Sequence, residues 1–126
     1  MATILVVEDE ANVRKLVAVN LSQRGHQVLE AISGQQALER LYDKKPALMV
    51  LDIKLPDLSG WDILDRLTTV PALPADIPVV VMTASPVDQN TILNKYPGVV
   101  EILIKPFNTE KLIAAVKRAL LKSGEA

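Results

Sequence analysis

Five runs of apolar residues, many of them β-branched, recur along the chain at a steady interval. Several runs are apolar at every position rather than at alternate positions, which is typical of strands buried on both faces of a parallel sheet. The pattern therefore predicts five strands, at Thr3 to Val7, Gln27 to Ala31, Ala47 to Leu51, Pro78 to Met82 and Val99 to Ile104.

A segment with helical spacing follows each run. In four of these segments, apolar residues recur three or four positions apart and so share one helical face. Ser33, Ser59-Gly60 and Asn108 are expected to begin the second, third and last helices, and Gly25 to end the first. The residues of the four apolar faces are Val13, Leu16, Val17 and Leu21, then Ala37, Leu38 and Leu41, then Trp61, Leu64 and Leu67, and finally Leu112, Ile113, Val116 and Leu120.

The fourth helix has the weakest pattern. Ser85 is expected to cap it and Pro86 to occupy its first position, so that the helix runs from Val87 to Tyr96. Strand and helix then alternate five times, and right-handed crossovers place helices on both faces of the sheet. The sequence predicts an α/β fold forming one domain over residues 1–122, followed by a polar, frayed tail at 123–126.

Composition narrows the class of protein. Lys and Arg number 14 and Asp and Glu number 15, for a formal net charge of −1, and this balance argues against direct nucleic-acid binding. The absence of cysteine excludes disulfides, and the single histidine, His26, excludes metal sites built from several histidines. His26 is expected to be an exposed turn residue. No apolar run approaches the roughly 20 residues that span a membrane, so a cytoplasmic protein is expected.

Polar groups cluster where the predicted strands end. Ligands of open α/β sheets bind beyond the carboxyl ends of the strands, and the second run offers no converging group there. If the first, third and fourth strands are neighbours with the fifth beyond, the remaining groups face one pocket. They are Glu8, Asp9 and Glu10 after the first run, Asp52 after the third, Thr83, Ala84 and Ser85 after the fourth, and Lys105 with Pro106 after the fifth.

Such a pocket has a definite chemistry. Clustered carboxylates repel one another unless a cation joins them, and hard oxygen ligands favour Mg²⁺. A carboxylate between a divalent cation and a lysine is suited to accept a phosphoryl group. Each residue alone is more often a cap, a solvated turn or a strand-end group. The hypothesis depends on four strand ends carrying the needed groups together.

Four segments, in this order and at these intervals, resemble the receiver domains of two-component response regulators. They are ILVVEDE, LMVLDIKLPDLSG, VVVMTAS and LIKPF, and the resemblance covers nearly the whole chain. It implies a flavodoxin-like three-layer sandwich, with a five-stranded parallel sheet in the order 2-1-3-4-5 and five helices. The chain is similar to the stand-alone regulators of chemotaxis and sporulation relays.

The resemblance also implies a role for each residue of the acidic cluster. Asp52 would accept a phosphoryl group from a phosphohistidine. Asp9 would bind Mg²⁺ directly, Glu8 would act through a coordinated water, and the backbone carbonyl of Lys54 would complete the protein ligands. Lys105 would pair with a phosphoryl oxygen of the modified side chain.

Three further positions follow from the same resemblance. The Thr83 hydroxyl would donate to the phosphoryl group, the small side chain of Ala84 would leave access to it, and the bond between Lys105 and Pro106 is expected to be cis. Phosphorylation would move Thr83 inward and change the surface of the fourth helix, fifth strand and fifth helix, where a partner binds.

One position departs from the family's pattern. The aromatic residue that often stands three positions before the lysine is replaced by Ile102, so the usual aromatic coupling step is in question. Tyr96 is an alternative switch residue, and Phe107 is expected to pack in the core. Lys54, with Ser85, stands at a site that varies in the family. Its side chain either slows hydrolysis of the phosphorylated state or points to solvent, and the sequence favours neither reading.

The implied partners are a sensor histidine kinase or a histidine phosphotransfer protein, and an unidentified downstream protein. A phosphorylation-dependent homodimer is an open alternative. The chain is not expected to be an enzyme beyond slow hydrolysis of its own aspartyl phosphate. Two rival functions are a non-phosphorylated interaction module and a Mg²⁺-dependent phosphatase of the haloacid-dehalogenase type. The phosphatase would need a second aspartate where Lys54 stands.

Overall fold

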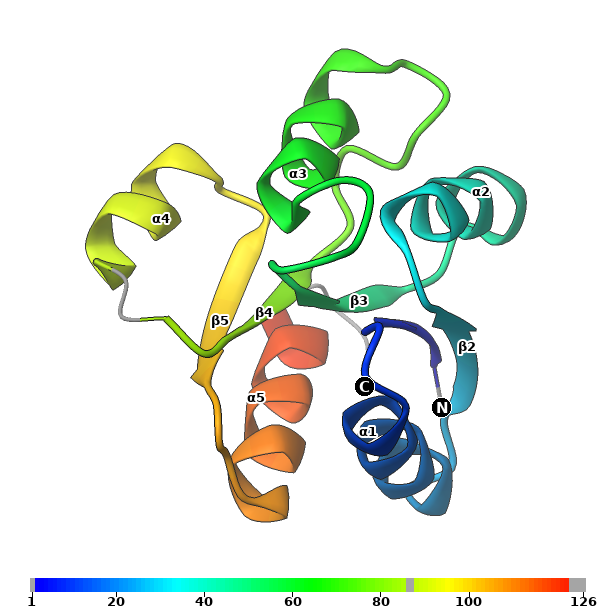
Figure 1. Cartoon of the computed structure of the whole chain (residues 1–126), viewed down its shortest axis with the longest axis vertical. Coiled ribbons are helices and arrows are strands. Elements are labelled where there is room, and N and C mark those ends of the chain that lie inside the picture. The colour runs from blue at the N-terminus through cyan, green and yellow to red at the C-terminus, as the bar shows by residue number, and fades with distance from the viewer. Residues whose placement is uncertain (1, 86–87, 123–126) are drawn as a thin grey trace.

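Strands and helices alternate throughout the chain (Figure 1). The computed structural model describes residues 2–85 and 88–122, so the tail predicted to fray lies outside the described residues. The strands are β1 (Thr3–Val7), β2 (Gln27–Ala31), β3 (Leu48–Asp52), β4 (Val79–Thr83) and β5 (Val99–Ile104). The helices are α1 (Ala11–Gln23), α2 (Gly34–Lys44), α3 (Gly60–Thr69), α4 (Gln89–Lys95) and α5 (Thr109–Lys122).

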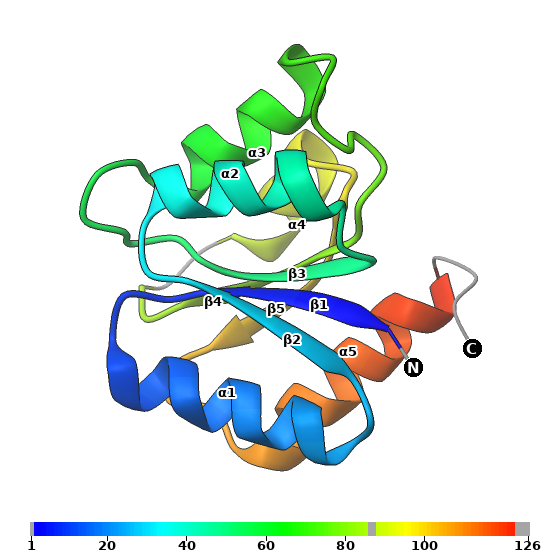
Figure 2. The same ribbon diagram turned by 90° about the vertical axis from the view of Figure 1, so that its right-hand side faces the viewer.

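The five strands form one parallel sheet in the order β2-β1-β3-β4-β5, which confirms the fold expected from the sequence. Figure 2 shows three layers, with α1 and α5 on one side of the sheet and α2, α3 and α4 on the other. All residues of β3 and β4 are buried. The continuous apolar runs thus did indicate strands covered on both faces.

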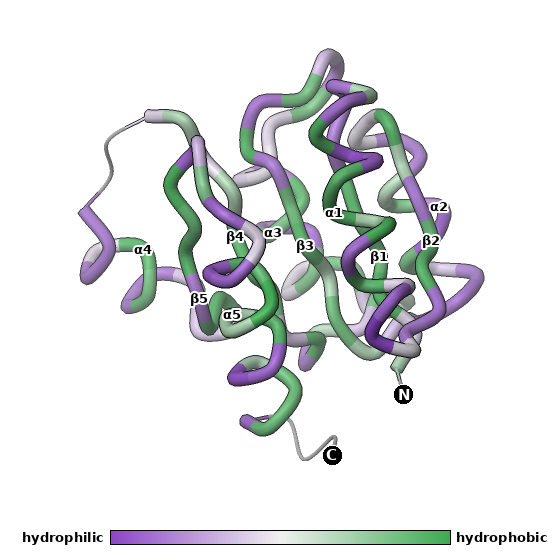
Figure 3. Tube along the Cα trace, turned by 90° about the horizontal axis from the view of Figure 1, so that it is seen from below, coloured by the Kyte–Doolittle hydropathy of each residue, from purple (hydrophilic) through white to green (hydrophobic). Residues whose placement is uncertain are grey.

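Each face of the sheet packs against its own helices. Val17 and Leu21 of α1 join Leu112 and Val116 of α5 in one apolar cluster. Ala37 and Leu41 of α2, Ile63 and Leu67 of α3 and Ile92 of α4 belong to the other. Along α1 and α5, hydrophobic and hydrophilic colours alternate turn by turn (Figure 3). Amphipathic helices therefore cover an apolar sheet, as their spacing predicted.

Side chains cap the helices largely where the sequence indicates. Ser33 accepts a hydrogen bond from the Gln36 amide, and Ser59 and Asp62 form a reciprocal capping box at the start of α3. Asn108 accepts from the backbone of α5, and Gly25, with a φ of 88°, follows α1. Such caps satisfy amides that a helix leaves without intrahelical partners.

Three expectations about local structure are wrong. Asp88, not Ser85, caps α4, because its carboxylate accepts from the amides of Asn90 and Thr91, and the expected first position, Pro86, lies outside the described residues. Leu16 is 45% exposed, because Val17, Ala18 and Leu21 form the buried stripe of α1. β3 and β4 each begin and end one residue later than predicted.

His26 also differs from its prediction as an exposed turn residue. Its side chain is half-buried, and Nδ1 accepts a hydrogen bond of 3.2 Å from the Ala2 amide. Partial burial lowers the pKa of His26 below its usual value. The histidine ties the start of β1 to the start of β2. Within residues 2–85 and 88–122, no helix is both long and apolar enough to cross a membrane.

Candidate functional site

Polar side chains from the ends of four strands lie together at one edge of the sheet. The order β1-β3-β4-β5 makes these strand ends neighbours, and the loops that follow β1 and β3 lie at the same side of the molecule, on the left of Figure 2. Glu8, Asp52 and Thr83 are the buried polar side chains among the described residues. Asp9 is exposed. The strand order therefore brings together groups that are far apart in the sequence.

The carboxylates of Glu8, Asp9 and Asp52 form a compact cluster. One oxygen from each lies within 4.8 Å of the others. Oxygen atoms at this spacing could hold a hard divalent cation, and their mutual repulsion favours one. Glu8 is fully buried, and the amide of Glu10 donates to its Oε2 at 3.2 Å.

Lys105 reaches this cluster from the end of β5. Its Nζ lies 2.5 Å from Glu8 Oε1 and 3.3 Å from Asp52 Oδ2. Charge-assisted hydrogen bonds of this kind are stronger than neutral ones. A single ammonium thus faces two buried carboxylates, so the cluster keeps an excess of negative charge.

The pKa values of Glu8 and Lys105 reflect this excess of negative charge. Burial raises the pKa of Glu8 to about 7. The hydrogen bond from Lys105 acts in the opposite direction, and the charge of Asp52 adds to the rise. Burial lowers the pKa of Lys105, but the hydrogen bond to Glu8 and the charges of Asp52 and Glu8 outweigh it and raise the pKa overall. The lysine is therefore a fixed positive charge, while Glu8 titrates near neutral pH.

A cleft of about 550 Å³ opens above the cluster. Asp52, Thr83 and Lys105 line it together with the exposed Asp9. Asp52 Oδ1 accepts from the Lys54 amide at 3.3 Å. The nucleophilic carboxylate predicted from the sequence thus faces an accessible space, beside a cation and a hydroxyl.

The loop between β3 and α3 is held tightly beside the cleft. A Cβ on Gly60 would lie 2.8 Å from the Ile53 Cα, so a glycine is needed at this close approach. Asp57 accepts from the amides of Gly34 and Gln35 at 2.7 and 2.9 Å, and these bonds, that of Gln35 first, lower the pKa of Asp57. The loop that carries the Lys54 carbonyl is therefore fixed to the start of α2.

Aromatic residues lie at one wall of the cleft. Trp61, which lines it, stacks on Tyr96 with ring centroids 5.5 Å apart and an interplanar angle of 17°. Ile102 and Tyr96 pack against the same apolar cluster, whereas Phe107 packs on the opposite side of the sheet, as expected of a core residue. Tyr96 thus connects the cleft wall to the end of α4.

Other predicted positions have clear surroundings. The bond between Lys105 and Pro106 is cis, which confirms the expectation. Thr83 Oγ1 accepts from the Ser85 amide at 3.2 Å. Lys54 and Ala84 are exposed and line the cleft.

The sequence analysis missed two residues beside the site, Arg14 and Glu30. Arg14 donates to the backbone carbonyl of Glu8, and it pairs with Glu30 at the end of β2. The signal was present in the sequence, because Glu30 stands near the end of the second strand and Arg14 near the start of the helix that follows the first strand. Glu30 itself does not line the cleft and is linked to the site through Arg14.

Comparison with known proteins gives a consistent result. The family model that describes the response regulator receiver domain matches residues 4–117. The Phosphate regulon transcriptional regulatory protein PhoB of Pseudomonas aeruginosa is 38% identical over 122 residues, which are 97% of this chain and 53% of that protein. The chain spans about half the length of the curated relatives it matches.

Solved structures agree with this match. A putative response regulator from Chloroflexus aurantiacus has a TM-score of 0.84 at 28% identity, covering 95% of this chain and 98% of that chain. A CheY-like receiver domain protein from Methanospirillum hungatei has a TM-score of 0.87 at 22% identity, covering 98% of this chain and 97% of that chain. The second likeness shows the fold alone.

Proposed function

Because the chain belongs to the response regulator receiver domain family, we propose that it is a phosphoacceptor switched by modification of Asp52. The observation that carries this proposal is the arrangement around one buried carboxylate. Asp52 lies in an open cleft, within 4.8 Å of two other carboxylates and 3.3 Å from the Lys105 ammonium. No other described carboxylate combines these surroundings.

In the proposed reaction, a carboxylate oxygen of Asp52 attacks the phosphorus of a phosphohistidine. The new O–P bond forms as the P–N bond breaks, and the electron pair returns to the imidazole nitrogen, which takes up a proton. The chain supplies the nucleophile and its surroundings, so catalysis depends on positioning and charge. Slow hydrolysis of the aspartyl phosphate by water would return Asp52 to its carboxylate.

The carboxylate cluster fits Mg²⁺, since its donors are hard oxygen atoms and one of its members, the Glu8 carboxyl, is buried with a raised pKa. We propose that Asp9, Asp52 and the Lys54 carbonyl hold the ion, with Glu8 acting through a water. Mg²⁺ supplies charge neutralisation at the transferring phosphoryl oxygens.

The remaining residues act on the phosphoryl group. Lys105 already contacts Asp52 and would pair with a phosphoryl oxygen. The Thr83 hydroxyl would donate to a second oxygen, and Ala84 leaves the approach to Asp52 free of a large side chain. The cis bond before Pro106 belongs to the loop that carries Lys105.

Phosphorylation would then change the surface formed by α4, β5 and α5. The modified Asp52 carries additional negative charge and strong acceptor oxygens. Movement of Thr83 toward them would shift the loop that leads into α4. Ile102 has no ring to rotate with that movement, so the coupling must use other residues, and Tyr96, stacked on Trp61, is placed to take part.

The donor would be a sensor histidine kinase or a histidine phosphotransfer protein, in the cytoplasm. The downstream partner would be a protein that binds the α4-β5-α5 surface, or a second copy of the chain. The names of the curated relatives describe transcriptional regulators, whereas this chain resembles their receiver half. We propose that the chain itself makes no direct contact with nucleic acid.

Incubation with acetyl phosphate and Mg²⁺ tests the proposal. We expect one acid-labile phosphoryl group, located on Asp52 by mass spectrometry after peptide digestion. D52N should remain unmodified, and D65N, which alters an exposed carboxylate on α3, should react as the wild type does. Turnover of phosphate esters would instead indicate the phosphatase. No modification at all would indicate a non-phosphorylated interaction module.

A further inference from the structure

We propose that Arg14 is a positioning residue for the cation site, holding the segment 8–10 so that its carboxylates face Asp52. This inference rests on the proposed function, because it concerns how the same site binds Mg²⁺. Arg14 lies on the second turn of α1, and its side chain is only 19% exposed. Its side chain bonds the backbone of Glu8 and Asp9 and the carboxylate of Glu30, so it would act on the site through these residues and not by touching Asp52 or Lys105.

One guanidinium joins three parts of the chain. Its Nη1 donates to the backbone carbonyl of Glu8 at 2.9 Å and to that of Asp9 at 3.5 Å. Its Nε donates to Glu30 Oε1 at 3.1 Å. Glu30 lies in β2, paired in register with Val6 of β1. The guanidinium is therefore anchored to the sheet while it holds the peptide units of both acidic residues.

These carbonyls need a partner of this kind. Glu8 and Asp9 precede Glu10, the cap of α1, so their carbonyl oxygens lie outside the helical hydrogen-bond ladder. Fixing the carbonyl of a residue restricts rotation of its peptide unit, and so restricts the direction in which its side chain leaves the backbone. The Glu8 and Asp9 carboxylates converge on Asp52 while their carbonyls face Arg14.

An arginine is suited to this role for a geometric reason. Its planar fork offers several donors in fixed directions, so one side chain can bond a carboxylate and a carbonyl at once. A lysine in the same place would keep the charge but could not reproduce the fork. The charge itself would weaken cation binding by repulsion, and Glu30 offsets it. A positioning role and a charge effect of Arg14 therefore predict different Mg²⁺ affinities for variants of Arg14 and Glu30.

Calorimetric titration of the whole chain with Mg²⁺ separates the two. If Arg14 acts by positioning the ligands, R14K should raise the Mg²⁺ dissociation constant by about 10-fold, the effect typical of groups that orient metal ligands. E30Q, which keeps an oxygen acceptor for Arg14, should bind nearly as the wild type does. If Arg14 acts through its charge alone, R14K should bind Mg²⁺ as the wild type does, R14M should bind it more tightly and E30Q more weakly. That second pattern, or an unchanged R14K, would overturn the proposal.

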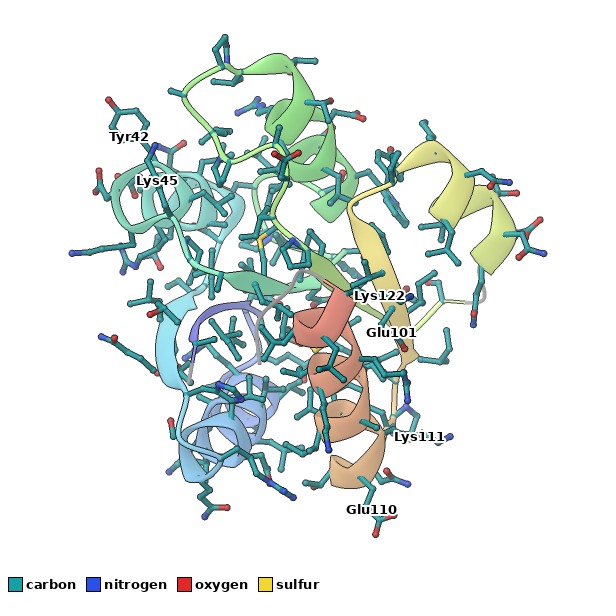
Figure 4. All side chains as sticks on the ribbon, turned by 180° about the vertical axis from the view of Figure 1, so that it is seen from behind. Tyr42, Lys45, Glu101, Glu110, Lys111 and Lys122 are labelled. Atoms are coloured by element: carbon teal, nitrogen blue, oxygen red, sulfur yellow. The ribbon has the colours of Figure 1, made fainter. Side chains whose placement is uncertain are left out.

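A matched pair elsewhere in the fold provides the control. Arg118 donates to Glu101 at 2.8 Å across α5 and β5, and Figure 4 labels Glu101 among the side chains seen from behind. R118K should leave Mg²⁺ affinity unchanged. Urea unfolding in EDTA establishes that R14K and E30Q are folded, and Glu30, at 51% exposure, tolerates the change to glutamine.

The Mg²⁺ dependence of modification by acetyl phosphate gives a second readout. R14K should need a higher Mg²⁺ concentration for half of its maximal rate, with little change in the rate at saturation. A lower saturating rate at an unchanged half-saturating concentration would contradict a positioning role. If the wild type itself neither binds Mg²⁺ nor becomes modified on Asp52, the proposed function fails, whereas a wild-type response shared by R14K defeats only the role of Arg14.

Discussion

Replacing Glu8 by glutamine should stabilise the metal-free protein at neutral and alkaline pH. Glu8 is fully buried, and its pKa rises from the usual 4.5 to about 7. A pKa difference between the folded and unfolded states is a stability difference of about 1.4 kcal/mol per pH unit. The interval from 4.5 to about 7 therefore corresponds to about 3 kcal/mol. E8Q removes the charge and keeps the size of the side chain.

The sign follows from proton binding. Below pH 4.5, Glu8 is protonated in both states, so its titration contributes nothing. Between 4.5 and about 7 the unfolded chain releases the proton while the folded protein retains it, and stability falls as pH rises. Above this window both states are ionised and the full cost remains. The advantage of E8Q should therefore be near zero at about pH 4 and reach about 3 kcal/mol at about pH 8.

Urea unfolding of the wild type and E8Q in EDTA, repeated across this pH range, measures the difference. E10Q, which changes the exposed carboxylate two residues further along the chain, serves as the control and should show no such growth with pH. The reasoning is refuted if E8Q is less stable than the wild type at about pH 8, or if the gap between them is constant between pH 4 and pH 8.

Three further predictions concern the cleft. G60A should lower the free energy of unfolding by about 1–3 kcal/mol, because the new Cβ would lie 2.8 Å from the Ile53 Cα, and denaturant unfolding that shows no loss would contradict the close approach. Mg²⁺ should change the fluorescence of Trp61, the single tryptophan, and an unaltered spectrum at concentrations where calorimetry detects binding would exclude it as a reporter. K54A should speed hydrolysis of the phosphorylated Asp52, and an unchanged or slower rate would favour the reading in which Lys54 points to solvent.

The clustering of polar groups at the strand ends could be predicted, because it depends on residue order and on topology. Parallel strands place their carboxyl ends at one edge, so Asp52, Thr83 and Lys105 had to be near one another once the strand order was known. The apolar runs indicated the strands, and their buried positions leave few alternatives for register. Composition added only exclusions, of disulfides and of sites with several histidines.

What could not be predicted depends on side chains that cross between elements. Arg14 reads as an ordinary helical arginine and Glu30 as a strand residue, and only their approach in space reveals the bond between them. Asp57 likewise reads as a turn residue, yet its carboxylate accepts from the amides of Gly34 and Gln35. Neither spacing nor propensity encodes such contacts, since each depends on how a loop lies over a neighbouring helix or strand.

The width of the buried stripe of a helix is another feature that the sequence pattern does not predict. Tyr42, labelled in Figure 4, is 59% exposed on α2 beside the buried Leu41. Helical spacing identifies the buried stripe, but it does not say how wide the stripe is. Leu16 shows the same effect, because α1 buries a narrow stripe and leaves the neighbouring leucine in solvent.

The cost assigned to Glu8 also explains why the site would respond to a cation. A buried carboxylate whose ionisation destabilises the fold gains when a cation neutralises it, so Mg²⁺ binding would recover part of that free energy. The same substitution that stabilises the metal-free protein should thus weaken its Mg²⁺ binding. A gain in stability together with weaker Mg²⁺ binding in E8Q would tie both properties to one buried charge, whereas a variant that gained stability and kept full Mg²⁺ affinity would separate them.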